Sequence, residues 1–520
     1  MAAGKGFYFE RRIKIMKKKR IVYAIIWIMM GALALMTIPT ESTTYADESL
    51  YVTHGAAAGD VTPHSAVIWS RANREGIMHV TVSKNQNSYG SIHKKVRVYV
   101  EHDFTGKIKI DKLSPDTLYY YHVWFGNNEH LDSDSQKSSF GAFRTAPSKD
   151  DAKPVKFGWG GDLAGQNVCR DSSEGFPIFM TIEAMNLDFF VGLGDMIYAD
   201  STCNEIGKYG NRQISGDFVQ SFDIHNFWAH WKYNREDRHY KDLLSKVPYF
   251  AIWDDHEVVN DFGPLHDTRN NSPYIPGEHL LPLGLAAFLD YNPIDENPET
   301  PKRLYRNIQW GKHVELFILD TRQYRDANFA IDDSVKPKTM LGREQLVWLK
   351  DKLTRSDATW KVIVSSVPMS IPTGSSENGR DGWANFDQNT GFEYELLDIL
   401  RFMKKQGMHN TIWITTDVHF AAVFRYMPFI DDSTFQVYEF VTGPLNAGLS
   451  PKFNYDTTTL GTERLFLYGP DGGGAGLNYE QAKLFMNFGL VEVDEKGNLT
   501  VSISNIYGDI KHKTTLLPRG

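Results

Sequence analysis

The stretch Asp188–Asp200 (DFFVGLGDMIYAD) restricts the possible folds more than any other part of this chain. Its mostly apolar run 189–193 has no helical period and predicts a short strand buried in an α/β sheet. Gly194 lets the backbone turn sharply and come close to a ligand. Asp195 and Tyr198 follow at the carboxyl end of this strand, where open α/β sheets place their binding sites.

A carboxylate and a phenol that leave one strand end suit a hard, Lewis-acidic metal ion. The alternative interpretation is that Asp195 caps the following helix and that Tyr198 packs in the core. Other parts of the sequence bear on this choice.

Three further predicted strands end in side chains of the same kind. Strand 155–159 leads to Asp162, strand 249–253 leads to the string DDHEVVND, and strand 411–415 leads to Asp417 and His419. Packed side by side, these strand ends would converge on one point. Carboxylates placed so close together repel one another unless a cation lies between them. Mostly oxygen donors with a few nitrogens suit Ca²⁺, Mn²⁺, Fe³⁺ or Zn²⁺, and a pair of such ions clamps a phosphate group.

The chain changes character at the polar linker 148–154. The preceding segment 51–147 has short alternating and β-branched runs, and its string Leu113–Tyr119 (LSPDTLY) is similar to the tyrosine corner of fibronectin type III and immunoglobulin-like sandwiches. We expect either a packing domain or a carbohydrate- or wall-binding module there. After the linker, strands alternate with helices. The expected helices are 177–186, 223–246, 343–353 and 393–405, and the further expected strands are 314–319, 360–365, 411–415 and 436–441.

The N-terminus has the pattern of a secretory signal peptide. Lys17–Arg20 is positively charged, 21–38 is apolar almost throughout, and Thr44-Tyr45-Ala46 supplies small residues before a cleavage point. We therefore expect a signal peptide at 1–46 and a secreted mature protein without a stable membrane span. An uncleaved membrane anchor is the alternative, and Arg11-Arg12 leaves twin-arginine export open.

Charge and cysteine content narrow the function further. The net charge is −8 and no basic block follows the N-terminus, which argues against nucleic acid as a partner. The two cysteines, Cys169 and Cys203, are too few for a disulfide scaffold. They could form one disulfide in an exported protein, or Cys169 could bind metal.

Several motifs resemble the alkaline phosphatase D (PhoD-like) family of exported metallophosphoesterases. They are Trp253–Asn260 (WDDHEVVN), Gly194–Tyr198 (GDMIY), Thr416–His419 (TDVH), Phe440–Gly448 (FVTGPLNAG) and Tyr233–Asp237 (YNRED). The likeness runs from about residue 51 to the C-terminus. It implies an α+β and α/β chain: an immunoglobulin- or fibronectin-like sandwich at 51–147, followed by a metallophosphoesterase α/β sandwich at 154–516.

The resemblance also implies two or more metal ions, with Ca²⁺ or Fe³⁺ expected and Mn²⁺ or Zn²⁺ as alternatives. Asp195 would bridge two ions, and His256 would contact the phosphate as electrophile or general acid. The other implied ligands are Asp162, Tyr198 and His419 for one ion, and Asp255, Asn260 and Asp417, with Asp254, for the second. Arg425, which follows the His419 strand, is the best placed of three arginines to bind phosphate oxygens, although a surface ion pair is the alternative.

The expected function is an exported metal-dependent hydrolase that cleaves phosphomonoesters, phosphodiesters or both with a metal-activated hydroxide. One alternative is a phosphodiesterase of phospholipase D type that acts on phospholipid or teichoic acid. Another is a wall- or ligand-binding protein with a structural metal site. Two departures matter: well-known members carry a cysteine where this chain has Asp162, which puts iron in doubt, and no histidine lies near 367–370, which argues against a purple acid phosphatase pattern.

Overall fold

The computed structural model describes residues 49–86, 92–126, 137–263, 276–375, 379–384, 390–452 and 454–519. From Leu50 onwards the chain forms one compact unit. The predicted signal peptide at 1–46 lies outside the described residues. Among the residues that are described, none of the helices combines the length and apolar character needed to cross a bilayer.

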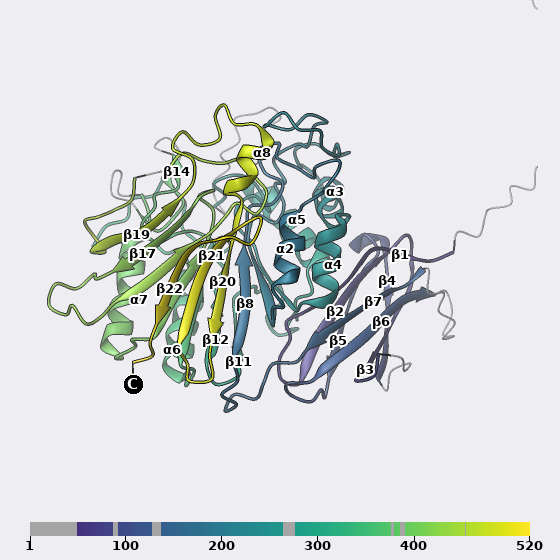
Figure 1. Ribbon diagram of the computed structural model, residues 1–520, viewed down its shortest axis with the longest axis horizontal. Coiled ribbons are helices and arrows are strands. Elements are labelled where there is room, and N and C mark those ends of the chain that lie inside the picture. Colours follow the sequence, from purple (N-terminus) through teal and green to yellow (C-terminus); the bar gives the residue numbers. More distant parts are fainter. Residues whose placement is uncertain are drawn as a thin grey trace, which may run out of the picture. The chain divides into compact units, whose positions relative to one another are not determined.

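The β-rich N-terminal segment contributes to two sheets (Figure 1). A four-stranded antiparallel sheet has the order β4-β3-β6-β7, with β3 at Gly76–Ser83, β4 at Ile92–Val98, β6 at Leu118–Gly126 and β7 at Ser139–Arg144. The remaining strands are β1 at Val52–Gly59, β2 at Ser65–Ala72 and β5 at Thr105–Asp111. These three do not close a separate sheet, because β1 continues into the strands that follow the linker.

The largest sheet has nine strands in the order β22-β21-β20-β8-β9-β10-β1-β2-β5. Its central strands β8, β9 and β10 run parallel, and β1 joins them in parallel with Gly59 opposite Tyr249. The six strands of this sheet that follow the linker are β8 at Val155–Gly160, β9 at Phe189–Leu193, β10 at Tyr249–Ile252, β20 at Asn487–Val493, β21 at Leu499–Asn505 and β22 at Ile510–Leu516. The segments before and after the linker therefore share one sheet.

A second, mixed sheet of seven strands has the order β11-β12-β13-β16-β18-β17-β19. Its strands are β11 at Arg306–Trp310, β12 at Val314–Ile318, β13 at Trp360–Val364, β16 at Thr411–Thr415, β17 at Ala421–Tyr426, β18 at Val437–Val441 and β19 at Thr462–Tyr468. Strands β12, β13, β16 and β18 are parallel, so their carboxyl ends meet at one edge.

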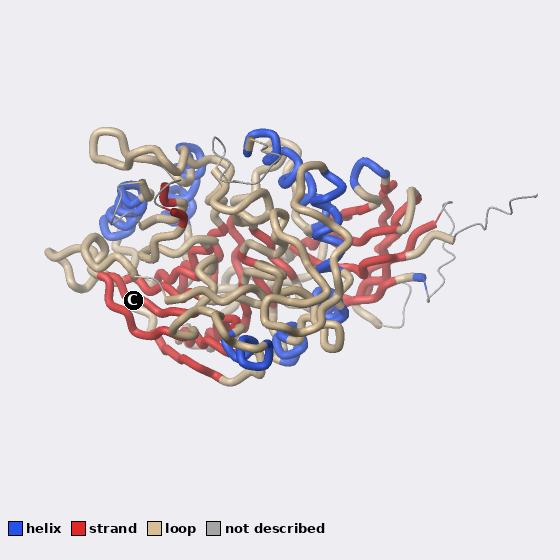
Figure 2. The backbone as a smooth tube through the Cα atoms, turned by 90° about the horizontal axis from the view of Figure 1, so that it is seen from above, coloured by secondary structure: helices blue, strands red, loops and turns tan. Residues whose placement is uncertain are grey.

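Alternate residues of the seven-stranded sheet pack to opposite sides, as the period of a strand requires. On β12, Leu316 packs in the same core as Phe157 of the nine-stranded sheet, whereas Phe317 packs in a second core with residues of α6 and α7. Between the sheets, the rings of Phe189 and Trp310 lie 4.7 Å apart. The two sheets thus pack face to face, and the helices lie outside the strands (Figure 2).

The helices follow their sequence signals. α7 (Glu393–Lys405) buries Leu396, Ile399, Leu400 and Met403, which is the spacing of one helix face. The predicted helix 223–246 is two helices, because Asp237 ends the first and caps the second by accepting the amide of Tyr240. The other helices are α2 at Ile178–Ala184, α3 at Ile224–Arg235, α4 at Arg238–Lys246, α5 at Gly277–Tyr291, α6 at Gly342–Arg355 and α8 at Tyr479–Ala482.

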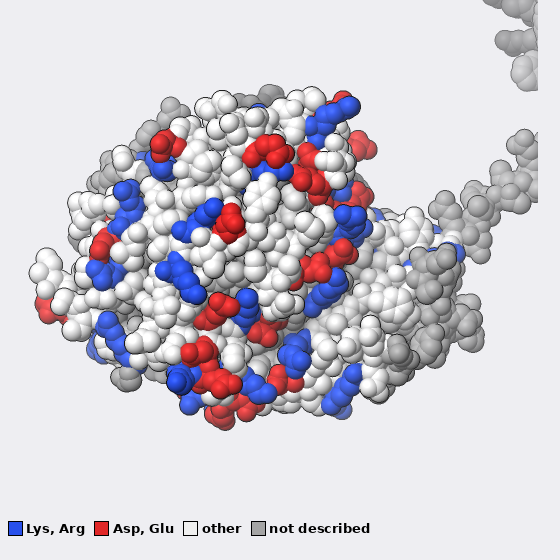
Figure 3. Space-filling view, in the orientation of Figure 1, with Lys and Arg blue, Asp and Glu red and all other residues white. Residues whose placement is uncertain are grey.

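On the face shown in Figure 3, positively and negatively charged side chains are interspersed.

Candidate metal centre

Strand ends from both sheets bring their acidic side chains to one place. Asp162, Asp195 and His419 offer ligand atoms that all lie within 4.8 Å of one another. A second group with the same spacing unites residues that follow β9, β10 and β16: Asp195, Asp254, Asp255 and Asp417. Asp195 belongs to both groups, which is the position that a bridging carboxylate needs.

The backbone is held in an unfavourable conformation at these strand ends. Asp162, Asp195, Asp417 and His419 have φ values of 63°, 51°, 80° and 57°, in the left-handed region that side chains seldom adopt. Such conformations cost on the order of 1–3 kcal/mol each and persist only where the surrounding structure enforces them. Gly194, with φ of 97°, permits the tight approach, because a Cβ there would lie 2.6 Å from Cβ of Asp254.

Glu257 holds two of the strand ends together. Its buried carboxylate accepts the backbone amides of Asp195 at 2.9 Å, Met196 at 2.8 Å and Asp254 at 2.8 Å. These amides belong to the ends of β9 and β10, so one side chain fixes both turns. Glu257 lies inside the string WDDHEVVN, but its position there does not indicate that its side chain binds backbone amides.

The protein itself supplies too few positive charges and hydrogen-bond donors to balance the negative charge of these carboxylates. Burial raises the pKa of Asp162 to about 7 against the opposing hydrogen bond from Thr416, and burial together with the neighbouring carboxylates raises the pKa values of Asp195 and Asp417 well above their usual range. In the two groups that meet at Asp195, four buried carboxylate oxygens have no hydrogen-bond partner among the described residues: Asp162 Oδ1, Asp195 Oδ2, Asp254 Oδ2 and Asp417 Oδ2. Buried carboxylates that lack partners fit bound cations, and the donor set suits hard metal ions.

His419 has the form that a metal ligand needs. Burial lowers its pKa to about 4, so the imidazole is neutral. Nδ1 contacts the carbonyl oxygen of Gly448 and therefore carries the proton. This leaves the Nε2 lone pair at the centre, 2.8 Å from the Tyr198 hydroxyl and 3.7 Å from Asp162 Oδ1. Tyr198 is buried beside the same carboxylates, as its position after β9 predicts.

His256 also packs against Tyr198, with the centres of the two rings 4.0 Å apart. Its Nδ1 lies 2.7 Å from Asp200 Oδ1, and Asp200 Oδ2 accepts the amide of Asn260 at 2.9 Å. Burial alone would lower the pKa of His256, but the charges of Asp200 and Asp255 raise it to about 10. The ring is therefore held as a cation in a fixed orientation.

Arg322 is a buried cation that sequence reasoning missed. Its guanidinium donates to Asp254 Oδ1 and, at 3.0 Å, to Asp381 Oδ2. Asp381 also forms a further acidic group with Asp255 and Asp261. Arg322 follows the end of β12, but its position in the sequence does not indicate which carboxylates it binds.

Two predicted residues lie at the margin. Asn260 is exposed, and its backbone amide binds Asp200. Arg425 lies on β17 and pairs with Tyr438 of β18, and Tyr438 pairs in turn with Ile412 of β16. Ile412 lies three residues before the end of β16, so Arg425 lies away from the sheet edge that holds the acidic groups. The structure does not bring Arg425 to the acidic groups, since its guanidinium pairs with Glu463 on β19 at the surface. This placement favours the surface ion pair over a role in binding phosphate.

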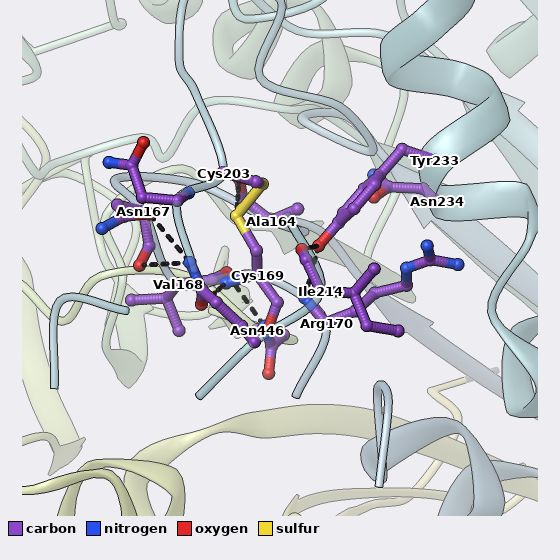
Figure 4. Close-up of a disulfide and its surroundings, with 12 residues drawn as sticks. Ala164, Asn167, Val168, Cys169, Arg170, Cys203, Ile214, Tyr233, Asn234 and Asn446 are labelled. Carbon is purple, nitrogen blue, oxygen red and sulfur yellow. Dashed lines mark hydrogen bonds between the residues drawn. A yellow bond between two sulfur atoms is a disulfide. The ribbon is translucent and has the colours of Figure 1, made fainter. Parts of the chain in front are cut away.

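The two cysteines form a disulfide. Cys169 and Cys203 have Cα atoms 5.8 Å apart and join the loop after β8 to the loop after β9 (Figure 4). Beside the disulfide, Asn446 donates to the carbonyl oxygens of Val168 and Cys169 at 3.0 and 3.3 Å. The thiol of Cys169 is used in this bond, so the alternative in which it binds metal is wrong.

Comparisons with known proteins agree with this geometry. A family model described as PhoD-like phosphatase matches residues 157–469, and a model of the PhoD-like phosphatase N-terminal domain matches residues 39–147. Alkaline phosphatase D of Bacillus subtilis (strain 168) is 26% identical over 403 residues, which cover 71% of this chain and 64% of that protein. The chain thus spans less than two thirds of the length of this curated relative.

Two solved structures show a similar fold. A structure of PhoD has a TM-score of 0.70 at 19% identity and covers 90% of this chain and 89% of its own. Purple acid phosphatase PPD1 from yellow lupin (Lupinus luteus) seeds has a TM-score of 0.57 at 13% identity, and the match covers 89% of this chain and 74% of the lupin chain. At these identities the likeness concerns the fold alone.

Proposed function

The chain belongs to the PhoD-like phosphatase family, and from this premise we propose that it is an exported, metal-dependent hydrolase of phosphoric esters. Its substrates would be phosphomonoesters, phosphodiesters or both. The observation that carries the proposal is the meeting of two acidic groups at Asp195, with the cationic His256 beside them. A purely structural metal site has no need of a protonated imidazole at its edge.

In this proposal Asp195 is shared by two metal ions. Asp162, Tyr198 and His419 would hold one, and the second would be held by Asp254, Asp255, Asn260 and Asp417. When bound, such ions neutralise charge on the phosphate and activate a water molecule. Asp162 in place of a cysteine makes the donor set richer in oxygen, which favours Ca²⁺, although Fe³⁺, Mn²⁺ and Zn²⁺ also accept these ligands.

The protein groups have separate tasks. His256 Nε2 would donate a proton to the leaving oxygen, since Nδ1 is bound to Asp200 and the ring carries a positive charge before the transfer. Asp254 would be oriented by Arg322 and by the Ser366 hydroxyl, which donates to its Oδ1 at 2.7 Å. Both donors bind Oδ1, and Oδ2 of Asp254 has no hydrogen-bond partner among the described residues, so Oδ2 would be free to bind a metal ion.

We extend the proposal to architecture and location. The two packed sheets after the linker would form a metallophosphoesterase α/β sandwich, and β1–β7 an immunoglobulin- or fibronectin-like sandwich. Support comes from the sheet order and from the match to the N-terminal domain model. Secretion after cleavage behind Ala46 rests on the pattern of residues 17–46 in the sequence.

One experiment tests the function. Purified protein loaded with Ca²⁺, Fe³⁺, Mn²⁺ or Zn²⁺ would be offered p-nitrophenyl phosphate and bis(p-nitrophenyl) phosphate, each with and without a chelator. We expect turnover of at least one ester that the chelator abolishes and added metal restores. Comparison of the two esters distinguishes a phosphomonoesterase from a phosphodiesterase. Stoichiometric metal without turnover of either ester would instead support a binding protein with a structural metal site.

A further inference from the structure

A cavity of about 620 Å³ opens at the edge of the seven-stranded sheet opposite the metal centre. Its walls come from residues before β12, β13 and β16, from the ends of α6 and α7, and from the C-terminal segment, whose end lies close to the lower end of α6 in Figure 1. Strands β12, β13 and β16 have five residues each, so at about 3.3 Å per residue they separate the two edges by roughly 16 Å. A small ligand in this cavity would not reach the metal ligands.

The cavity is lined by an excess of positive charge. Its charged residues are Lys312, Lys361, Lys496, Arg519 and Glu495, and His313 and His409 also line it. None of the three lysines forms an ion pair with a carboxylate among the described residues. Four cations against one carboxylate is unusual in a chain whose net charge is −8.

The positive charge of Lys361 is not balanced by a neighbouring carboxylate. Its ammonium group donates to the carbonyl oxygen of Ala358 at 2.7 Å. Burial lowers its pKa, and the more distant carboxylates of Glu315 and Asp357 do not restore it. An anion in the cavity would favour the charged form of this side chain.

We propose that this cavity binds a phosphate-bearing anion at a site separate from the metal centre. Several cations that line one cavity match an anion that carries more than one charge, and phosphate is such an oxyanion, which lysine and arginine both bind. The volume accommodates more than a single phosphate group. The ligand is therefore either free inorganic phosphate or a stretch of a phosphodiester chain, which share this chemistry.

Site-resolved lysine labelling tests the proposal on the full metal-loaded chain. The protein would be acetylated briefly with inorganic phosphate, with a glycerol phosphate oligomer, or with chloride at equal ionic strength, and each lysine quantified by peptide mass spectrometry. We expect several-fold slower acetylation of the exposed Lys312 and Lys496 with a phosphate ligand. Lys513, exposed on β22 outside the cavity, should not change.

The outcomes separate the two sources. Protection by phosphate and oligomer alike identifies free phosphate as sufficient, whereas protection by the oligomer alone identifies a phosphodiester chain. Absence of protection by both, or equal slowing at Lys513, overturns the proposal. Because labelling requires no turnover, the result does not depend on the proposed hydrolase activity.

A charge-removing variant provides the second test. Lys312→Gln combined with Lys496→Gln should weaken binding of the protecting ligand at least tenfold, as measured by protection of Lys361, while ester hydrolysis remains unchanged. Lys513→Gln is the matched control and should bind like the wild type. Unchanged protection of Lys361 in the double variant would contradict the assignment of these cations to the site.

Discussion

Asp195 is the residue that joins the group of Asp162 and His419 to the group of Asp254, Asp255 and Asp417. Asp195→Asn keeps the shape of the side chain but removes the charge that two cations would share. We expect loss of metal and of ester hydrolysis together, measured by metal analysis and turnover on the same sample. Asp150→Asn, at an exposed position in the linker, is the control. Full metal occupancy with normal turnover in the Asp195 variant would end the two-metal interpretation.

His256 permits a sharper test, because the role proposed for it differs from the metal-binding role proposed for the residues around it. His256→Ala should retain the metal ions and lose roughly 10²–10⁴ in kcat, the usual contribution of general acid–base catalysis. The loss should shrink for an ester with a very acidic leaving group, which needs no proton. Asp200→Asn should show the same dependence on the leaving group more weakly, since Asp200 acts through His256. Metal lost along with activity would instead identify His256 as a ligand.

The difference between these residues and Glu257 shows what a sequence can reveal about a site. Asp162, Asp195 and Asp417 were predictable because each lies two residues after the end of a strand, and parallel strands end at a common edge. Glu257 and Arg322 act on groups distant in sequence: one accepts the amides of two strand ends and the other binds carboxylates from two loops. Nothing in the local spacing indicates such partners. They become visible only when the strands are placed side by side.

At the scale of elements, the disulfide connects two long loops that follow neighbouring strands. Cys169 and Cys203 are 34 residues apart, and closing a loop of that length stabilises a fold by about 2–4 kcal/mol through the unfolded chain. Replacing both with serine should lower the free energy of unfolding by this amount, measured by urea denaturation. A reductant should abolish the difference between variant and wild type. Equal stability without reductant would contradict the prediction.

The segment between β12 and α6 contains Lys338, a buried lysine that makes the fold sensitive to pH. Its ammonium group donates to the carbonyl oxygens of Asn328, at 2.9 Å, and Thr390, and lies 3.9 Å from the centre of the Phe392 ring. Burial and the nearby Arg325 lower the pKa of Lys338 to about 7. The unfolded chain, with a pKa of about 10.4, binds the proton more strongly.

The sign of the pH effect follows from this difference. Between about pH 7 and pH 10 the unfolded state carries more protons, so the stability contributed by this site rises with pH and is flat below about pH 7. Lys338→Met has no such group. Urea midpoints would be measured at intervals from pH 6 to pH 10. As pH rises, the midpoint of the wild type should increase relative to that of the methionine variant. A constant difference between the two proteins would contradict the prediction.

Elements themselves were predictable where the pattern was local. The runs 155–159 and 189–193 appear as β8 and β9 within a residue, because a short apolar run in an α/β chain has few alternatives. The break between α3 and α4 was missed, since Asp237 caps a helix inside a continuous aromatic pattern. The pairing of β1 with β10 could not be predicted, because almost two hundred residues separate them and neither strand specifies its neighbour.

At the scale of the whole molecule, the segments before and after the linker are joined by more than the shared sheet. The indole of Trp69 on β2 donates to the carbonyl oxygen of Asp290 at 2.7 Å, and the guanidinium of Arg235 lies 5.0 Å from its ring. Arg306 pairs with Asp60 at 2.8 Å. All three contacts are buried or half-buried and cross from one segment to the other.

We therefore expect residues 50–519 to unfold as one cooperative unit. Scanning calorimetry of the metal-free protein, with its disulfide intact, should show a single transition whose calorimetric and van't Hoff enthalpies agree. Trp69→Ala should lower the midpoint of that transition without splitting it. Two resolved transitions, one of them retained by a fragment beginning at residue 154, would show that the segments fold separately.

The parallel pairing of β1 with β10 also determines what becomes of a truncated protein. Without residues 50–147, β10 would be left as the last strand of its sheet, Tyr249 would lose its pairing with Gly59, and four buried side chains would lie beside the open edge. Such edges recruit strands from other copies of the same chain. A shortened version would therefore tend to aggregate even if its metal centre formed correctly, so expression designs aimed at that centre should keep the N-terminal strands.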